Sequence, residues 1–128
     1  LELGPQIVVI KCGQAGAYLR TLDPPERLDR CVGHPEDWRE VEIFEPTCRV
    51  EEVASATGAG DSSIAGFLAA MLRGEDPHWC MASLTTVGAQ NLSALGAISG
   101  VQSWEETVRQ VKSKPEKNPL PERLAGLQ

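Results

Sequence analysis

A glycine-rich turn that leads directly into a helical pattern constrains this chain more than any other feature. Residues 57–61, TGAGD, carry two glycines around an alanine, and apolar residues at helical spacing follow as far as residue 72. Glycines let the backbone turn tightly, so that several N–H groups point the same way at the positive end of the helix dipole. The pattern therefore predicts an anion-binding turn, with the carboxylate of Asp61 in the first turn of the helix.

Length and composition are typical of one compact domain. The chain has 128 residues, of which 41% are hydrophobic, and this is enough for an ordinary core. Its net charge of −6 disfavours nucleic acid as a partner, and its apolar runs are far shorter than the ~20 residues that span a bilayer. The cysteines show no zinc-type pairing, which predicts reduced structural thiols and a cytoplasmic location: Cys12, Cys31, Cys48 and Cys80.

Four segments are predicted as strands: 6–12, 17–21, 41–44 and 48–53. The first is a continuous β-branched run, typical of a strand covered on both faces of a parallel sheet. A tight turn over 13–16 would pair the second strand back on it as a hairpin. Residues 22–40 are rich in proline and charge, which predicts an exposed loop. Because residue 1 is not methionine and an interior-type strand follows at once, we expect a C-terminal piece of a longer protein.

Three helices are predicted: 61–72, 77–92 and a third that starts at 104. Gly74 would end the first, Asp76 would cap the second and Ser103 would cap the third. The tryptophans are interpreted as packing anchors, because no basic residues alternate with them as nucleic-acid binding would require: Trp38, Trp79 and Trp104. The chain would then divide into a domain over 1–112 and a polar tail over 113–128.

Residues 56–67, ATGAGDSSIAGF, resemble the C-terminal signature of the ribokinase-like (PfkB-type) carbohydrate kinases. Residues 7–16 resemble the family's strand and Gly-x-x-Gly turn under the nucleotide, and residues 91–100 resemble the segment that closes the adenine side. The likeness covers about residues 6–111, apart from the loop 22–40. It implies an α/β, three-layer ribokinase-like fold with a mainly parallel sheet flanked by helices, of which this chain would be the C-terminal, nucleotide-binding part.

The resemblance also implies ATP-dependent phosphoryl transfer to a hydroxyl of a small sugar or sugar-like substrate, with Mg²⁺ carried on the ATP. Asp61 would be the general base that accepts the hydroxyl proton, a role that typically contributes ~10²- to 10⁴-fold. The turn would form an anion hole for the transferred phosphoryl group: Gly58, Ala59 and Gly60. The resemblance assigns nucleotide binding to six further residues: Lys11, Gly13, Gly16, Thr85, Gly88 and Ala89.

One departure from the family concerns a monovalent cation. Ser55 stands where the family often has an aspartate that helps to bind potassium, and serine brings no charge. We therefore expect potassium to bind weakly, if at all, at the corresponding residues: Ser55, Thr57, Asn91, Ala94 and Gly96.

A second departure is that the family's sugar-contacting residues, lid and acidic magnesium motif lie upstream of the matched segments. The isolated chain is therefore expected to be inactive. It would need the N-terminal part of the same enzyme, and its exposed strand edge could also pair with a second copy as a homodimer.

Two other hypotheses stay open at this point. A non-catalytic nucleotide- or sugar-sensing module on the same fold would use the turn to bind without reaction; Ser55 favours this hypothesis, and the retention of Asp61 disfavours it. A structural α/β domain would carry the turn only as a tight connection. The sequence does not identify the acceptor.

Overall fold

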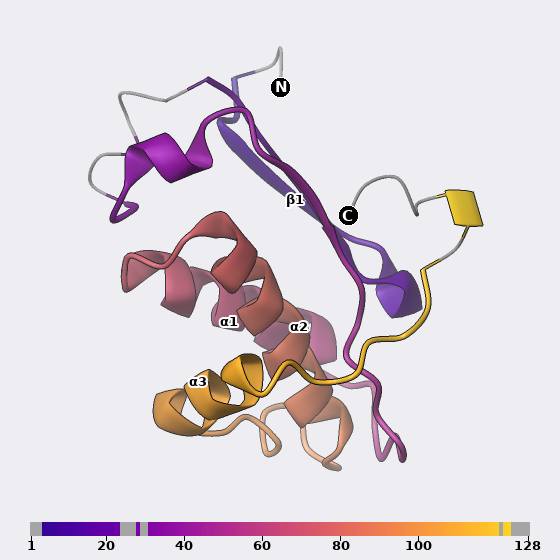
Figure 1. Cartoon of the computed structure of the whole chain (residues 1–128). Helices are drawn as coiled ribbons and strands as arrows, with labels where there is room; N and C mark the ends of the chain where they lie inside the picture. The colour runs from indigo at the N-terminus through magenta and orange to yellow at the C-terminus, as the bar shows by residue number, and fades with distance from the viewer. Residues whose placement is uncertain (1–3, 24–27, 29–30, 121, 124–128) are drawn as a thin grey trace.

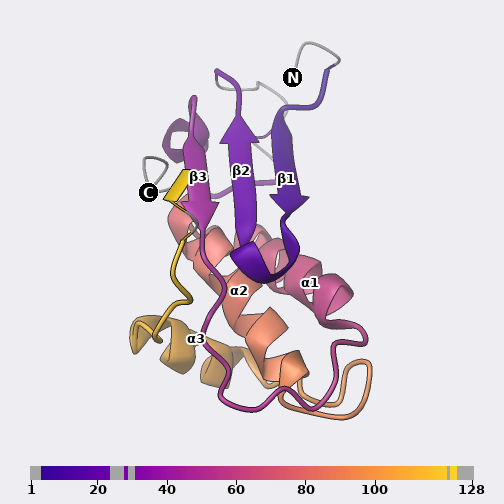
Figure 2. The same ribbon diagram turned by 90° about the vertical axis from the view of Figure 1, so that its right-hand side faces the viewer.

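The computed structural model describes residues 4–23, 28, 31–120 and 122–123. Its helices, strands and two 3₁₀ helices (η) follow the order β1 (Ile7–Lys11), η1 (Gly13–Ala15), β2 (Ala17–Thr21), η2 (Pro35–Trp38), β3 (Glu42–Glu45), α1 (Ala59–Leu72), α2 (Pro77–Leu92) and α3 (Trp104–Lys112). Figures 1 and 2 show the strands on one side of the molecule and the helices packed together on the other. Within the described residues, no helix combines the length and apolar character that a membrane crossing requires.

The described strands form an antiparallel sheet in the order β1-β2-β3. Ile7 pairs with Thr21 and Lys11 with Ala17, which confirms the predicted hairpin. The expected mainly parallel, three-layer arrangement is not confirmed: all described strand pairs are antiparallel, and α1, α2 and α3 lie on one side of the sheet (Figure 1). The short turn between β1 and β2 permits only antiparallel pairing. The apolar run of β1 lies at the sheet edge, where Ile10 is 51% exposed.

Two predictions about the connecting segments are wrong. Residues 48–53 do not form a strand, because only Cys48 finds a pairing partner, in a single antiparallel bridge to Lys117. The segment 22–40 is not simply an exposed loop, since η2 folds back and buries Trp38 completely. Residues 24–27 and 29–30 of that segment lie outside the described residues.

The helix boundaries follow the predicted caps. Helix α1 begins two residues earlier than expected and ends at a Schellman motif in which the Gly74 N–H bonds back into the last turn. The Asp76 carboxylate accepts a hydrogen bond from the Trp79 N–H at 2.8 Å, so α2 starts where predicted. The Ser103 hydroxyl accepts one from the Glu106 N–H at 3.2 Å and starts α3. The three predicted helix starts and the two predicted helix ends are thus confirmed to within two residues.

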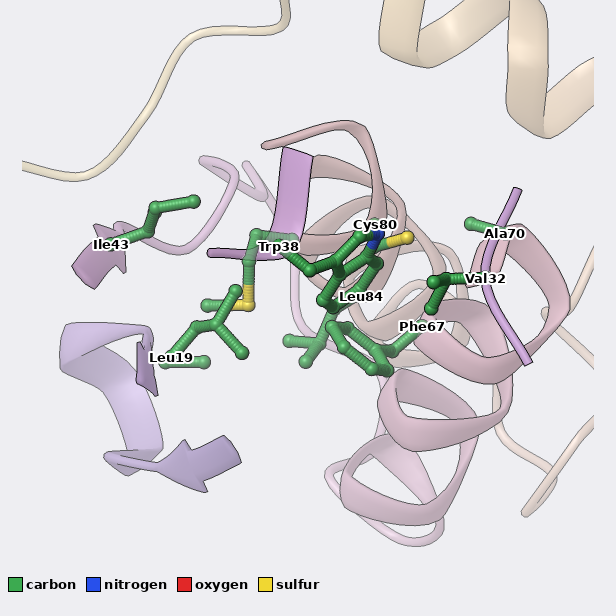
Figure 3. Packing of buried hydrophobic residues seen from close by; sticks show 10 residues of the cluster. Leu19, Val32, Trp38, Ile43, Phe67, Ala70, Cys80 and Leu84 are labelled. Atoms are coloured by element: carbon green, nitrogen blue, oxygen red, sulfur yellow. The ribbon is translucent and has the colours of Figure 1, made fainter. Parts of the chain in front are cut away.

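The core lies between the sheet and the pair α1 and α2 (Figure 3). The Trp38 and Phe67 rings meet edge to face with centroids 6.1 Å apart. Trp79 and Trp104 pack together at 5.4 Å on the rim of this core. The interpretation of the three tryptophans as packing anchors is therefore confirmed. The helix pair positions the glycine-rich turn, because this turn forms the N-terminal end of α1.

Candidate functional site

The glycine-rich turn forms the start of α1. Gly58 is the residue before the helix and has a φ of 77°, in the left-handed region. The Ala59 N–H bonds to the Ala56 carbonyl at 3.3 Å, whereas the N–H groups of Gly60 and Asp61 have no acceptor among the described residues. Both residues are exposed. Two free amides therefore project from the positive end of the helix, where an anion is favoured.

The end of α2 and the loop that follows it contact this turn. The fully buried Asn91 side chain donates a hydrogen bond from Nδ2 to the Thr57 carbonyl at 2.9 Å. A Cβ added at Gly58 would lie 2.8 Å from the Ala97 carbonyl carbon and closer still to its oxygen. The turn and the loop are thus in direct backbone contact, so residues 91–97 fix the position of the free amides.

Lys11 brings a positive charge to the same place. A Cβ added at Gly60 would lie 2.8 Å from the Lys11 ammonium nitrogen, which places the ammonium directly over the turn. Within the described part of the chain, neither Lys11 nor Asp61 takes part in an ion pair. The ammonium and the two free amides together make a strongly anion-attracting corner, with the exposed Asp61 carboxylate beside it.

This corner opens into a cleft of about 720 Å³. The cleft lies between η1, residues 47–56, the first turn of α1 and the middle of α2. All six residues expected to bind the nucleotide line it: Lys11, Gly13, Gly16, Thr85, Gly88 and Ala89. Ala59 and Gly60 of the expected anion hole line it too, while Gly58 and Asp61 lie next to them in the turn, outside the lining. The structure therefore gathers the expected residues from four separate segments around one cavity.

The lining also includes residues for which the sequence carried no signal. Thr47 lies between two segments expected to be strands, Cys48 belongs to the second of them, and Asn118 and Pro119 come from the expected polar tail. Their part in the cleft depends on contacts between positions about 70 residues apart in the chain, such as the 2.8 Å bond from Asn118 Nδ2 to the Thr47 hydroxyl. Sequence spacing alone does not report such contacts.

A second cavity, of about 830 Å³, lies on the other side of residues 48–54 and reaches α3. Apart from Ala89, it contains none of the expected site residues. Its buried amide, Gln90, is hydrogen-bonded through both ends to Thr107, Gln110 and the Gln102 N–H. We therefore assign the site to the smaller cleft.

The potassium candidates match a cation site poorly. None carries a charge, the Thr57 carbonyl already accepts the Asn91 amide, and the Ser55 hydroxyl accepts the Thr57 N–H at 3.1 Å. Among the described residues, the Asn91 Oδ1 atom is the one buried side-chain oxygen of this set without a hydrogen-bond partner. Because one uncharged oxygen does little to replace a hydration shell, no step of the reaction is derived through potassium.

The described residues bring together no divalent-metal centre of their own. Among residues 4–23, 28, 31–120 and 122–123, no three His, Cys, Asp or Glu side chains come together in a way that could hold a metal ion. The chain's own contribution to the site is therefore the amides, the Lys11 ammonium and the Asp61 carboxylate.

The model of the pfkB family carbohydrate kinases matches residues 1–104, most of the chain. The chain belongs to this family. No curated protein matches this pfkB-family chain in sequence.

Solved structures of similar fold include a Methanocaldococcus jannaschii nucleoside kinase of the ribokinase family, with 22% identity and a TM-score of 0.66 over 84% of this chain and 30% of that one. The Arabidopsis thaliana ribokinase in complex with ribose and ATP has 22% identity and a TM-score of 0.68 over 87% and 30%. The Salmonella enterica aminoimidazole riboside kinase has 24% identity and a TM-score of 0.60 over 86% and 33%. The pfkB-family chain thus has a ribokinase-like fold and spans about a third of the length of these structures.

Proposed function

We propose that this chain supplies the nucleotide-binding half and the general base of an ATP-dependent kinase that phosphorylates a hydroxyl of a small sugar or sugar-like substrate. One observation supports this most strongly: a single cleft is lined by all six expected nucleotide-binding residues and ends at a corner with two free amides and an ammonium. The cleft volume of about 720 Å³ is within the ~300–1,000 Å³ of small-molecule sites.

The proposed chemistry follows from the charges at the corner. The N–H groups of Gly60 and Asp61 and the Lys11 ammonium would bind the γ-phosphate and stabilise the charge that spreads over its equatorial oxygens during transfer. The Asp61 carboxylate, exposed and without a hydrogen-bond partner among the described residues, would accept the proton of the attacking hydroxyl. Magnesium, when bound with ATP, would neutralise phosphate charge. The free cysteines agree with a reducing, cytoplasmic setting.

The remaining parts of the active site would come from outside this chain. Its solved relatives are about three times as long, so the sugar pocket and the lid would belong to the N-terminal part of the same enzyme, or the strand edge would pair with a second copy. The isolated chain would then bind ATP without turnover.

The test is Asp61→Asn in this chain joined to the N-terminal part. Turnover should fall by ~10²- to 10⁴-fold, because the amide cannot accept the proton. ATP affinity should stay within about twofold, since the residue lies outside the cleft lining. Glu105→Gln, an exposed carboxylate in the first turn of α3, is the matched control and should leave both values unchanged. A wild-type rate for Asp61→Asn would remove the general-base assignment.

A second candidate function, a nucleotide or sugar sensor, is favoured by one observation: the uncharged Ser55 at the expected cation position. ADP release measured across a panel of sugars distinguishes the two, because a sensor binds ATP without sugar-dependent ADP formation. A domain in which the turn is only structural would show no amide shifts at residues 58–61 when ATP is added.

A further inference from the structure

We propose that residues 116–119 are a wall of the nucleotide cleft and that Lys117 is the positioning residue that holds this wall to the rest of the site. The proposal rests on the proposed function, since the ligand it concerns is the nucleotide. The segment lies outside the matched family region, which ends at residue 104, and in the part of the chain expected from the sequence to be a polar tail.

The first observation is that this segment is extended and pairs through its backbone with the residues that follow β3. Residues 116–118 run antiparallel to residues 47–49: the Arg49 N–H donates to the Glu116 carbonyl at 2.7 Å, and the Asn118 N–H donates to the Thr47 carbonyl at 2.9 Å. Figure 2 shows the chain after α3 running alongside the end of β3. Backbone hydrogen bonds at both ends fix the segment in register, so it is part of the folded unit.

The second observation is the set of contacts made by the Lys117 ammonium. It lies 2.7 Å from the Glu45 carboxylate, donates to the Thr85 hydroxyl at 2.8 Å and approaches the Cys48 sulfur at 3.3 Å. The two charged side chains are only 27% and 20% exposed, so water screens their attraction less than on an open surface. One ammonium thus joins β3, the segment after β3 and the middle of α2.

The third observation is what these contacts do to the cleft. The Thr85 hydroxyl donates to the Ala82 carbonyl at 3.1 Å and accepts from Lys117, so its orientation is fixed from both sides. The Asn118 amide donates to the Thr47 hydroxyl, which donates to the Gln14 carbonyl at 2.9 Å in η1. Residues 116–119 therefore tie the α2 wall of the cleft to the η1 wall.

The position of this wall indicates which part of the nucleotide it would contact. Gly88 lies beside Ser63 in the first turns of α1, close to the phosphate-binding corner. Thr85 lies three residues, almost one helical turn, before Gly88 in α2; because α2 runs antiparallel to α1, this direction leads away from the start of α1. The wall built by Lys117 and Asn118 thus lies toward the end of the cleft away from Gly60, where the base and ribose would bind. Its loss should weaken binding of the nucleoside part and leave binding of the phosphates unchanged.

The experiment compares two ligands on the full 128-residue chain by isothermal titration calorimetry: ATP and inorganic tripolyphosphate. Lys117→Met keeps most of the length of the side chain, one heavy atom shorter, and removes its charge. It should weaken ATP about tenfold, because the nucleotide would then have to order a wall that the charge-assisted hydrogen bond of Lys117 holds in place in the wild-type chain, and leave tripolyphosphate affinity within twofold. Lys11→Met should instead weaken both ligands, because it removes the charge on the phosphate side of the cleft. Lys112→Met, an exposed lysine at the end of α3, is the control.

A second variant guards against misfolding, because Lys117→Met leaves the mostly buried Glu45 carboxylate unpaired. The double variant Glu45→Gln and Lys117→Met removes both charges and should still bind ATP about tenfold more weakly than the wild-type chain. Equal ATP affinity in the wild-type chain and the double variant, or an equal loss for tripolyphosphate, would overturn the proposal and leave the proposed function standing. A wild-type chain that binds neither ligand would overturn both.

Discussion

Replacement of Gly58 by alanine tests whether the loop after α2 fixes the phosphate-binding turn. The φ of 77° is in the left-handed region, where a side chain costs ~1–2 kcal/mol. The new Cβ would also lie 2.8 Å from the carbonyl carbon and 3.0 Å from the Cα of Ala97. Backbone atoms cannot rotate away as a flexible side chain can, so the loop must shift, and overpacking of this kind costs a further ~1–3 kcal/mol. The free energy of unfolding should therefore fall by ~2–5 kcal/mol in total.

The chain offers a matched control at Gly13. Its φ of 58° lies in the same left-handed region, but a Cβ added there would have no described heavy atom within 4 Å. Gly13→Ala should therefore lower the free energy of unfolding by only the conformational cost of ~1–2 kcal/mol. The difference between the two variants, ~1–3 kcal/mol, measures the contact with Ala97 alone.

Urea unfolding followed by tryptophan fluorescence gives both free energies. The slope against urea should be the same in the wild-type chain and both variants, because the surface exposed on unfolding is unchanged. An equal loss in the free energy of unfolding for Gly58→Ala and Gly13→Ala would refute the reasoning. It would show that the loop at Ala97 moves to accommodate the added methyl group with no loss of stability. In that case the loop would not hold the turn in place.

Two other predictions concern the core. Trp38→Ala should lower the free energy of unfolding by ~3–5 kcal/mol, because a fully buried ring that packs on Phe67 is lost; a loss below ~1 kcal/mol in the same urea assay would contradict the burial. Burial raises the pKa of the Cys80 thiol from 9.0 to about 12, so its contribution to stability is complete below pH 9 and is lost as the pH rises toward 12. Cys80→Ala should remove this part of the alkaline decline, and a thiol reagent should modify the exposed Cys12 and Cys31 well before Cys80.

The features that could be predicted from the sequence are those decided by neighbouring residues. The caps at Asp76 and Ser103 and the glycine after α1 act within one turn of their helices, so residue type and spacing were sufficient. The hairpin likewise depends on a short turn between two apolar runs. The glycine-rich turn belongs to the same class, because its free amides follow directly from the start of a helix after glycine.

The features that could not be predicted depend on partners far along the chain. Trp38 lies in a proline- and charge-rich segment, and its burial depends on Phe67, which comes 29 positions later. Residues 48–53 had the composition of a strand, but a strand also needs a partner to complete its hydrogen bonds. Lys117 reaches Cys48 across 69 positions, and no local pattern in a lysine- and proline-rich segment indicates that contact.

The failure of the parallel-sheet expectation has a physical cause that bears on function. The apolar run of β1 was interpreted as a strand covered on both sides, yet Ile10 is half exposed in this chain. Helix α1 likewise exposes Leu68 and Leu72, which lie one and two turns beyond Ala65 on the same stripe as Asp61. Under the proposed function, the N-terminal part of the enzyme would cover this stripe. The surface that buries those leucines would then also bring the acceptor hydroxyl to the Asp61 carboxylate, so that burial of apolar surface and completion of the active site would be the same event.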